Sequence, residues 1–226
     1  NSGSDHLINL IGDFTIEFWV YFNTTGSTGG TGHQTLLYIS GSSTSSLAAV
    51  RLDEYNSQIR LLASTDGSSW TGFPSSNSGV FNNNTWYHVA IVRSGSTVSM
   101  YLNGQLAANP VTNSTSLTST QTFAIGRQNS TTSQYTTGWI VGVRITKAAV
   151  YTTTFTPPLR TTAITTVANT TFCLPMSANL TETANSLTIT NNGTVAQTTA
   201  NHSFGHILQE VANLDRKSTR LNSSHT

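Results

Sequence analysis

Hydrophobic and polar side chains alternate in short runs along most of the chain. In the clearest run, residues 13–22 (DFTIEFWVYF), every second residue from Phe14 to Phe22 is apolar. Such alternation places the apolar set on one face of a β-strand. Runs of the same kind predict further strands at residues 35–39, 47–52, 58–63, 86–93, 97–102, 123–125 and 139–146.

The segments between these runs carry turn chemistry. Gly, Ser and Asn gather at residues 24–32, 41–46, 66–69 and 81–84, so that a turn recurs every 8 to 15 residues. Asn103 and Gly104 form the dipeptide that favours a type I′ hairpin turn. Residues 146–151 would form a single helical turn at most. The pattern predicts an all-β fold, an antiparallel two-sheet sandwich.

Composition narrows the function classes. The 226 residues include 29 Ser, 40 Thr and 20 Asn, and 8% of the chain is charged, with a formal net charge of +1. Ten Lys and Arg residues are too few to neutralise a run of phosphates, so we expect no nucleic acid partner. No apolar run reaches the roughly 18 residues that span a bilayer, so we expect no membrane insertion. The lone Cys173 excludes an intramolecular disulfide, and stability must come from a sheet core.

The C-terminal residues change character. Residues 215–225 (DRKSTRLNSSH) resemble the translation of a short-read sequencing adapter and hold three of the ten Lys and Arg residues. We therefore interpret residues 207–226 as a non-native tail, of which 215–226 is adapter-like, and leave it out of the fold prediction. The chain is expected to be a fragment of a longer reading frame.

Three segments carry a family resemblance. Residues 13–22, 84–104 (NTWYHVAIVRSGSTVSMYLNG) and 138–158 (GWIVGVRITKAAVYTTTFTPP) resemble laminin-G-like, concanavalin A-like jelly-roll domains, which occur in extracellular proteins and in phage tail proteins. The resemblance implies a jelly-roll sandwich over residues 1–158. It implies less about activity, because this architecture carries lectins, adhesins, spacers and hydrolases alike.

A C-terminal segment resembles the opening strands of such a domain. It covers residues 169–206 and follows a linker at residues 159–168. Two explanations stay open: the segment begins a tandem second copy, or it completes the first sandwich as in a circular permutation. An unpaired sheet edge invites association, so we expect the segment to pair with the first sandwich.

The carboxylates do not form a catalytic pattern. Hydrolases of this fold resemble one another in a strand with Glu-x-Asp-x-x-Glu, because retaining glycosidases need two carboxyl groups about 5 Å apart. Asp13 and Glu17 share a face but lie ~13 Å apart along an extended strand. The family's closing strand commonly carries acidic residues where this chain has Val141 and Gly142. We therefore expect no enzyme activity.

The resemblance also suggests calcium, because oxygen ligands from sandwich loops suit this ion. The candidates are Asp53, Glu54 and Asp66, loop carboxylates that flank the predicted strand at residues 58–63. The alternative, that they are solvated loop charges, stays open. The sequence thus predicts that no cofactor is required and leaves calcium as an option.

Carbohydrate recognition needs aromatic rings for sugar faces, and amides or carboxylates for hydroxyls. The turn-rich segments offer both kinds of group. The candidate ligand-binding residues are Trp70, Tyr55, Phe73, Asp66 and Asn56. For Trp70 the alternative is a hairpin residue that covers the sheet. Trp19, Trp86 and Trp139 lie within predicted strands and are expected to be packing residues.

These features together predict a non-catalytic carbohydrate-binding or adhesion module on a virion surface or an extracellular surface. Its partner would be a glycan or a cell-surface polysaccharide, bound by tandem copies or by a homo-oligomeric fibre. One alternative is a structural spacer or decoration domain of a phage tail or surface protein, without a ligand of its own. A glycoside hydrolase is the other alternative, and it lacks a carboxylate pair.

Overall fold

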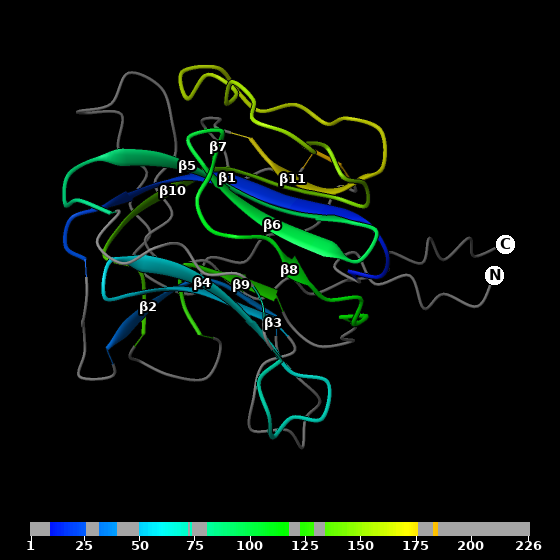
Figure 1. Ribbon diagram of the computed structural model, residues 1–226. Coiled ribbons are helices and arrows are strands. Elements are labelled where there is room, and N and C mark those ends of the chain that lie inside the picture. Colours follow the sequence, from blue (N-terminus) through cyan, green and yellow to red (C-terminus); the bar gives the residue numbers. More distant parts are fainter. Residues whose placement is uncertain are drawn as a thin grey trace, which may run out of the picture.

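The computed structural model describes residues 10–25, 32–39, 50–71, 73, 81–117, 123–128, 134–175 and 183–184. The regular elements in these ranges are all strands, and they form two antiparallel sheets packed face to face (Figure 1). The predicted all-β sandwich of the jelly-roll type is therefore confirmed. Within the same ranges, no helix is long and apolar enough to cross a membrane.

The two sheets differ in size. The larger, seven-stranded sheet has its central strands β10, β1 and β5 in antiparallel register. In spatial order it contains β11 (Thr170–Leu174), β10 (Gly138–Thr146), β1 (Phe14–Phe22), β5 (Trp86–Ser94), β6 (Thr97–Leu102) and β7 (Gln105–Leu106), with β8 (Val111–Thr112) paired to β6. The four-stranded sheet contains, in order, β4 (Gln58–Ala63), β3 (Val50–Tyr55), β2 (His33–Ile39) and β9 (Phe123–Ile125).

The core lies between the two sheets. The apolar set of β1, from Phe14 to Phe22, is buried and belongs to the main core cluster, as the alternation predicted. The four-stranded sheet contributes side chains such as Leu37, Leu52 and Leu61 to the same cluster. Removing apolar surface from water is worth about 25 cal/mol per Å², so this interior supplies the main stabilising term.

A buried arginine closes one end of the core. Arg93 lies at the end of β5 on the face toward the core and is 1% exposed. Its guanidinium donates hydrogen bonds to the carbonyl oxygens of Leu10 (2.8 Å), Thr115 (2.5 Å) and Gly12. A buried cation is tolerated because its donors are satisfied in this way.

Two hairpins have two-residue turns with left-handed backbones. Asn103 (φ 50°) and Gly104 (φ 78°) join β6 to β7, which confirms the predicted turn. Asn56 (φ 51°) and Ser57 (φ 60°) join β3 to β4 in the same manner. Positive φ at both central positions matches the right-handed twist of the flanking strands. As a result β3 extends to Tyr55, beyond the predicted end at residue 52.

A β-bulge changes the face of the sheet on which the side chains of β10 lie. The register between β1 and β10 shifts between Glu17 and Trp19, which pair with Arg144 and Val141. The extra residue is accommodated where Gly142 adopts a φ of 63°. A bulge redirects the side chains that follow it. Arg144 therefore lies on the outer face of the sheet, opposite Glu17, instead of pointing toward the core.

Residues 147–168, which we call the strap, cross the outer face of the seven-stranded sheet (Figure 1). They include the predicted linker and lead into β11, which pairs antiparallel with β10. Phe172 of β11 is fully buried and contacts Phe123 of the other sheet, with ring centroids 5.2 Å apart. Residues Thr170–Leu174 thus complete the sheet of their own chain. The remainder of the predicted second-copy segment, apart from residues 169, 175 and 183–184, and the predicted tail lie outside the described residues.

Candidate functional site

The outer face of the four-stranded sheet carries a row of arginine, aspartate and aromatic side chains. In β3, Arg51, Asp53 and Tyr55 alternate with core residues and so share the outer face. The register places Arg60 of β4 directly opposite Asp53. Trp70 follows β4 in a loop that returns to the strand through the Thr71 N–H, which donates to the Ala63 carbonyl oxygen at 2.7 Å. We call Trp70, Arg51, Asp53, Arg60 and Tyr55 the arginine ladder.

Asp53 is the centre of the arginine ladder. Its carboxylate is fully buried and accepts two hydrogen bonds from Arg60, from Nε to Oδ1 and from Nη2 to Oδ2, both at 2.9 Å. Arg51 Nε lies 3.0 Å from Oδ2 of the same carboxylate. Bidentate contact with a guanidinium fixes both distance and plane. Two cations against one anion leave this group with a net positive charge.

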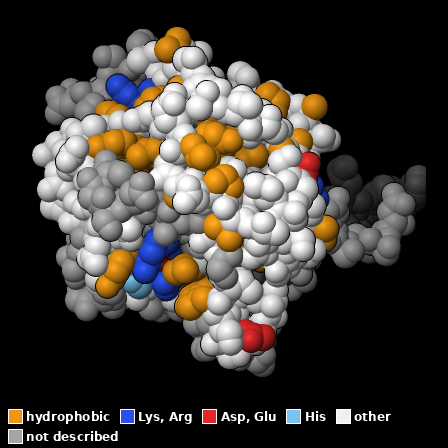
Figure 2. Space-filling view, in the orientation of Figure 1, with side chains coloured by type: hydrophobic (Ala, Val, Ile, Leu, Met, Phe, Trp, Pro, Cys, Tyr) orange, Lys and Arg blue, Asp and Glu red, His pale blue; other side chains and the backbone are white. Residues whose placement is uncertain are grey.

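An aromatic ring lies against each guanidinium. The central guanidinium carbon of Arg51 is 5.0 Å from the ring centroid of Trp70, and that of Arg60 is 4.2 Å from the ring of Tyr55. Both separations are within the range of cation–π attraction. The side chains of Arg51 and Arg60 remain 15% and 24% exposed, and Trp70 is 36% exposed. Figure 2 shows basic side chains gathered beside hydrophobic ones on the lower half of the molecule, where the four-stranded sheet lies.

The structure brings two of the five predicted ligand-binding residues into the arginine ladder, Trp70 and Tyr55. Asp66 instead organises its own loop, since its Oδ1 accepts from the N–H groups of Ser68 and Ser69, both at 2.8 Å. These bonds lower the pKa of Asp66 well below its usual range. Asn56 is an exposed turn residue, and Phe73 is half-buried against the core cluster. These three residues have roles in the fold and lie outside the arginine ladder.

The three calcium candidates do not form one site. Asp53 and Glu54 lie within β3, not in a loop, and adjacent strand residues point to opposite faces. Glu54 is buried, where its carboxylate accepts from Gln34 Nε2 at 3.1 Å and from the Ser57 N–H at 2.7 Å. Across the part of the chain that the structure describes, no three His, Cys, Asp or Glu residues are grouped to hold a metal ion. The predicted loop placement of Asp53 and Glu54 was wrong because the turn at residues 56–57 extends β3 through both positions.

Arg51 and Arg60 are the site residues that the sequence prediction missed. A signal for them was present in the sequence. If Asn56 and Ser57 are read as a two-residue turn, residue 53 must pair with residue 60, and an aspartate then faces an arginine across the hairpin. The period-two alternation along β3 adds Arg51 to the same face.

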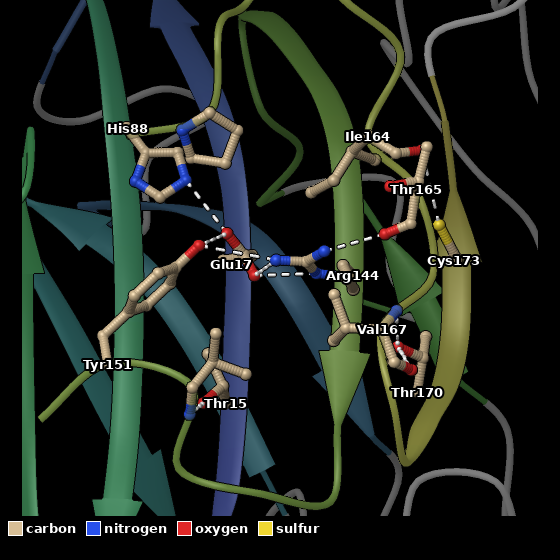
Figure 3. A network of polar contacts seen from close by, with 12 residues as sticks. Thr15, Glu17, His88, Arg144, Tyr151, Ile164, Thr165, Val167, Thr170 and Cys173 are labelled. Carbon is tan, nitrogen blue, oxygen red and sulfur yellow. Dashed lines mark hydrogen bonds and ion pairs between the residues drawn. The ribbon is translucent and has the colours of Figure 1, made fainter. Parts of the chain in front are cut away.

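The outer face of the other sheet contains a buried polar network centred on Glu17 of β1 (Figure 3). Arg144 Nε donates to Glu17 Oε1 at 2.8 Å, and the hydroxyl of Tyr151, from the strap, donates to Oε2 at 2.9 Å. His88 Nε2 lies 3.3 Å from Oε2, outside hydrogen-bond geometry, as an ion-pair contact. Arg144 also donates to the Thr165 carbonyl oxygen at 2.7 Å. The network attaches the strap to the sheet and serves the fold.

The Glu17 network makes the stability of the protein depend on pH. Burial alone would raise the pKa of Glu17, but His88 and the Arg144 guanidinium together lower it below the ordinary value of 4.5. A depressed pKa contributes stability above the pKa of the unfolded chain, and that contribution is lost as pH falls through the folded-state value. We therefore expect the urea midpoint of unfolding to decrease as pH drops below about 4.5. Glu17→Gln should flatten this decrease, and an unchanged acid dependence in Glu17→Gln would assign it to other carboxylates.

The three strand tryptophans lie on the outer face of the seven-stranded sheet, half-buried. Trp86 and Trp139 flank Tyr21 in one cross-strand row, with ring centroids 5.4 and 4.3 Å from it. Trp19 Nε1 donates to the Pro158 carbonyl oxygen of the strap at 3.2 Å. Arg160 lies over Trp86, with its guanidinium carbon 4.7 Å from the ring centroid. These rings pack on one another and on the strap.

The chain is similar to a known protein family in sequence and to several solved proteins in structure. The family described as the Concanavalin A-like lectin/glucanases superfamily matches residues 2–153. A candidate carbohydrate-binding protein from Bacteroides ovatus superposes with a TM-score of 0.54 at 13% identity, over 92% of this chain and 55% of that protein. Domains LG4-5 of the mouse laminin alpha1 chain give 0.45 at 14% identity, over 67% of this chain and 42% of theirs. Tailspike protein 2 of bacteriophage CBA120 gives 0.45 at 15% identity, over 62% and 23% of the two chains.

No curated protein matches the chain. The chain spans about half the length of the Bacteroides protein, 55%. At 13% identity that similarity shows a shared fold, and function must be argued from the residues of this chain.

Proposed function

The chain belongs to the concanavalin A-like lectin/glucanases superfamily, and on that premise we propose that it is a non-catalytic carbohydrate-binding or adhesion module. The observation that carries the proposal is the arginine ladder, in which Trp70 and Tyr55 flank two arginines that share Asp53. Sugars offer apolar C–H faces and a rim of hydroxyls. A site for them combines exposed rings with fixed polar donors.

The binding mode follows from the contacts within the ladder. Trp70 is exposed enough to accept a pyranose face, and its contact with Arg51 holds the ring close to a donor. The Asp53 carboxylate holds the Arg60 guanidinium by two hydrogen bonds and attracts Arg51 Nε at 3.0 Å before a ligand arrives, which lowers the entropic cost of binding. Hydroxyl groups of the sugar would accept hydrogen bonds from the exposed edges of Arg51 and Arg60.

The acidic residues are held in hydrogen bonds and ion pairs, which supports a non-catalytic role. Glu17 is buried in its network, and Asp53 is held by two arginines. Asp13 accepts from the Gly95 N–H at 2.7 Å, and Asp66 closes its own loop. Glycoside hydrolysis needs one carboxyl group that can give a proton and a second that can attack or activate water. Among the described residues, these four carboxylates are committed to structural contacts instead.

The setting we propose is an extracellular or virion surface, with several copies acting together. A single shallow site of rings and donors binds weakly, and tandem or oligomeric presentation raises the effective concentration of the remaining sites. The surface chemistry suits this setting, because Ser, Thr and Asn dominate the composition and only 8% of residues are charged. Calcium is not required in this proposal, since no ligand contact depends on it.

Replacing Trp70 by alanine tests the proposal. We expect Trp70→Ala to weaken binding about tenfold or more on a glycan array and in titrations, because a central aromatic contact carries a large share of binding energy. Trp86→Ala is the matched control, since Trp86 also lies under an arginine but on the other sheet. Binding should persist in a chelator.

Three results would count against the proposal. An equal loss in Trp70→Ala and Trp86→Ala would remove the ladder as the site. Sugar release from a polysaccharide would point to a hydrolase. A folded full chain that binds no glycan would favour the structural spacer or decoration domain.

A further inference from the structure

We infer that the arginine ladder selects acidic sugars and that Arg51 and Arg60 bind the carboxylate of a uronic acid residue. The inference rests on the proposed carbohydrate-binding function and adds the chemical class of the ligand. Its support is the positive charge of the ladder and the direction of the arginine hydrogen-bond donors.

The arginines of the ladder keep donors that Asp53 does not use. Arg60 uses Nε and Nη2 for Asp53, and Arg51 approaches Asp53 through Nε. The Nη1 group of Arg60 is therefore directed away from this carboxylate, whereas Arg51 Nε contacts it as an ion pair outside hydrogen-bond geometry. A planar guanidinium edge matches a carboxylate in two parallel hydrogen bonds. The ladder thus offers the free edge of Arg60 and the partly exposed guanidinium of Arg51 beside an exposed indole ring.

The ladder carries a local positive charge. Arg51 and Arg60 share the single carboxylate of Asp53, which leaves one positive charge unbalanced. Asp66 is bound within its own loop by the Ser68 and Ser69 N–H groups. Glu54 faces the opposite side of β3. In Figure 2 the acidic side chains at the bottom of the view lie apart from the basic cluster. A chain with so few charges therefore concentrates positive charge at this place.

The aromatic rings of the ladder lie beside the arginines in a way that suits a charged sugar. Trp70 and Tyr55 each lie against one guanidinium, and the N–H groups that would bind a ligand lie in the plane of that guanidinium. A sugar that bears a carboxylate could place this group on the Arg51 edge and its pyranose ring near Trp70. A neutral sugar would gain the ring contact and hydrogen bonds from the guanidiniums to its hydroxyls, but not the attraction between opposite charges or the two parallel hydrogen bonds that a carboxylate accepts.

The experiment compares matched pairs of ligands on the full chain by titration calorimetry. The probes are oligomers of galacturonate, alginate and hyaluronan, each against a form whose carboxyl groups are methyl-esterified or reduced to alcohols. We expect at least one free acid to bind about tenfold or more tightly than its neutral partner. This preference should shrink at high salt, since the Debye length falls from about 10 Å at 0.1 M to about 3 Å at 1 M.

Arg51→Gln separates the charge from the fold. Arg60 continues to hold Asp53 through two hydrogen bonds in this variant, so the site keeps its anchor. We expect roughly a tenfold loss of affinity for the free acid and less than a twofold change for the neutral partner. Arg160→Gln is the matched control, because Arg160 also lies over a tryptophan but outside the ladder, and it should bind as the parent does.

The outcomes separate the acidic-sugar inference from the proposed binding function. Equal affinity for every acid and its neutral partner would overturn the acidic-sugar inference and leave the binding function intact. The absence of binding to acidic and neutral glycans alike would overturn the proposed function itself.

Discussion

Arg144→Leu will destabilise the protein by about 3 kcal/mol or more, because it leaves the carboxylate of Glu17 buried without its cation. Glu17 and Arg144 are 0% and 5% exposed, and the guanidinium binds both Glu17 and the Thr165 carbonyl oxygen. The hydroxyl of Tyr151 and the contact with His88 Nε2 do not replace the hydrogen bonds of the guanidinium at this depth. Urea unfolding of the purified variant, followed by tryptophan fluorescence, measures the change.

The double variant Glu17→Leu, Arg144→Leu is the informative partner of this experiment. Replacing both members of a buried ion pair by apolar side chains is often close to neutral, whereas removing one is not. We therefore expect the second substitution to restore much of the stability that the first removes. A double variant as unstable as Arg144→Leu would show that packing, and not the unpaired charge, sets the effect.

The fold was predictable because its strands are amphipathic and its turns are chemically explicit. Residues 58–63, 97–102 and 123–125 form β4, β6 and β9 with the predicted bounds. Alternation specifies a strand and its buried face, and Asn103-Gly104 specifies a hairpin. Those signals are local, so a single sequence contains them.

The site was less predictable because it depends on small departures from regular alternation. The sequence placed Asp53 and Glu54 in a loop, but the two-residue turn at Asn56 and Ser57 lets β3 continue through both. Asn-Ser is not the usual dipeptide for this turn geometry. In β10, the bulge at Gly142 turned Arg144 outward to meet Glu17. A shift of one residue reverses the face of a side chain, and strand periodicity alone does not locate such a shift.

The two outer faces of the sandwich have different tasks. On the seven-stranded sheet the strap covers Glu17, His88 and Trp19, and the polar groups there are used internally. On the four-stranded sheet the ladder keeps Trp70 and parts of both arginines exposed. Changes to the strap should therefore affect stability, whereas changes to the edge of the ladder should affect binding.

Gly104→Ala tests whether the strap is held by close backbone contact. A Cβ atom at Gly104 would lie 1.8 Å from the carbonyl oxygen of Phe155, and the Phe155 N–H donates to the Gly104 carbonyl oxygen at 3.0 Å. Phe155 in turn stacks on Tyr151, with ring centroids 3.6 Å apart. We expect a loss of about 3 kcal/mol, of which roughly 1 kcal/mol is the cost of positive φ in alanine and the rest is displacement of the strap.

Gly95→Ala separates these two contributions. Gly95 has a φ of 59°, similar to the 78° of Gly104, but a Cβ atom there would meet nothing within 4 Å. This variant should therefore lose only the backbone term, about 1 kcal/mol, and keep the strap resistant to limited proteolysis. Gly104→Ala should be cleaved faster within residues 147–168 and still bind glycans through the ladder. If both variants lost the same stability and resisted proteolysis equally, the contact between Gly104 and Phe155 would not be what holds the strap on the sheet.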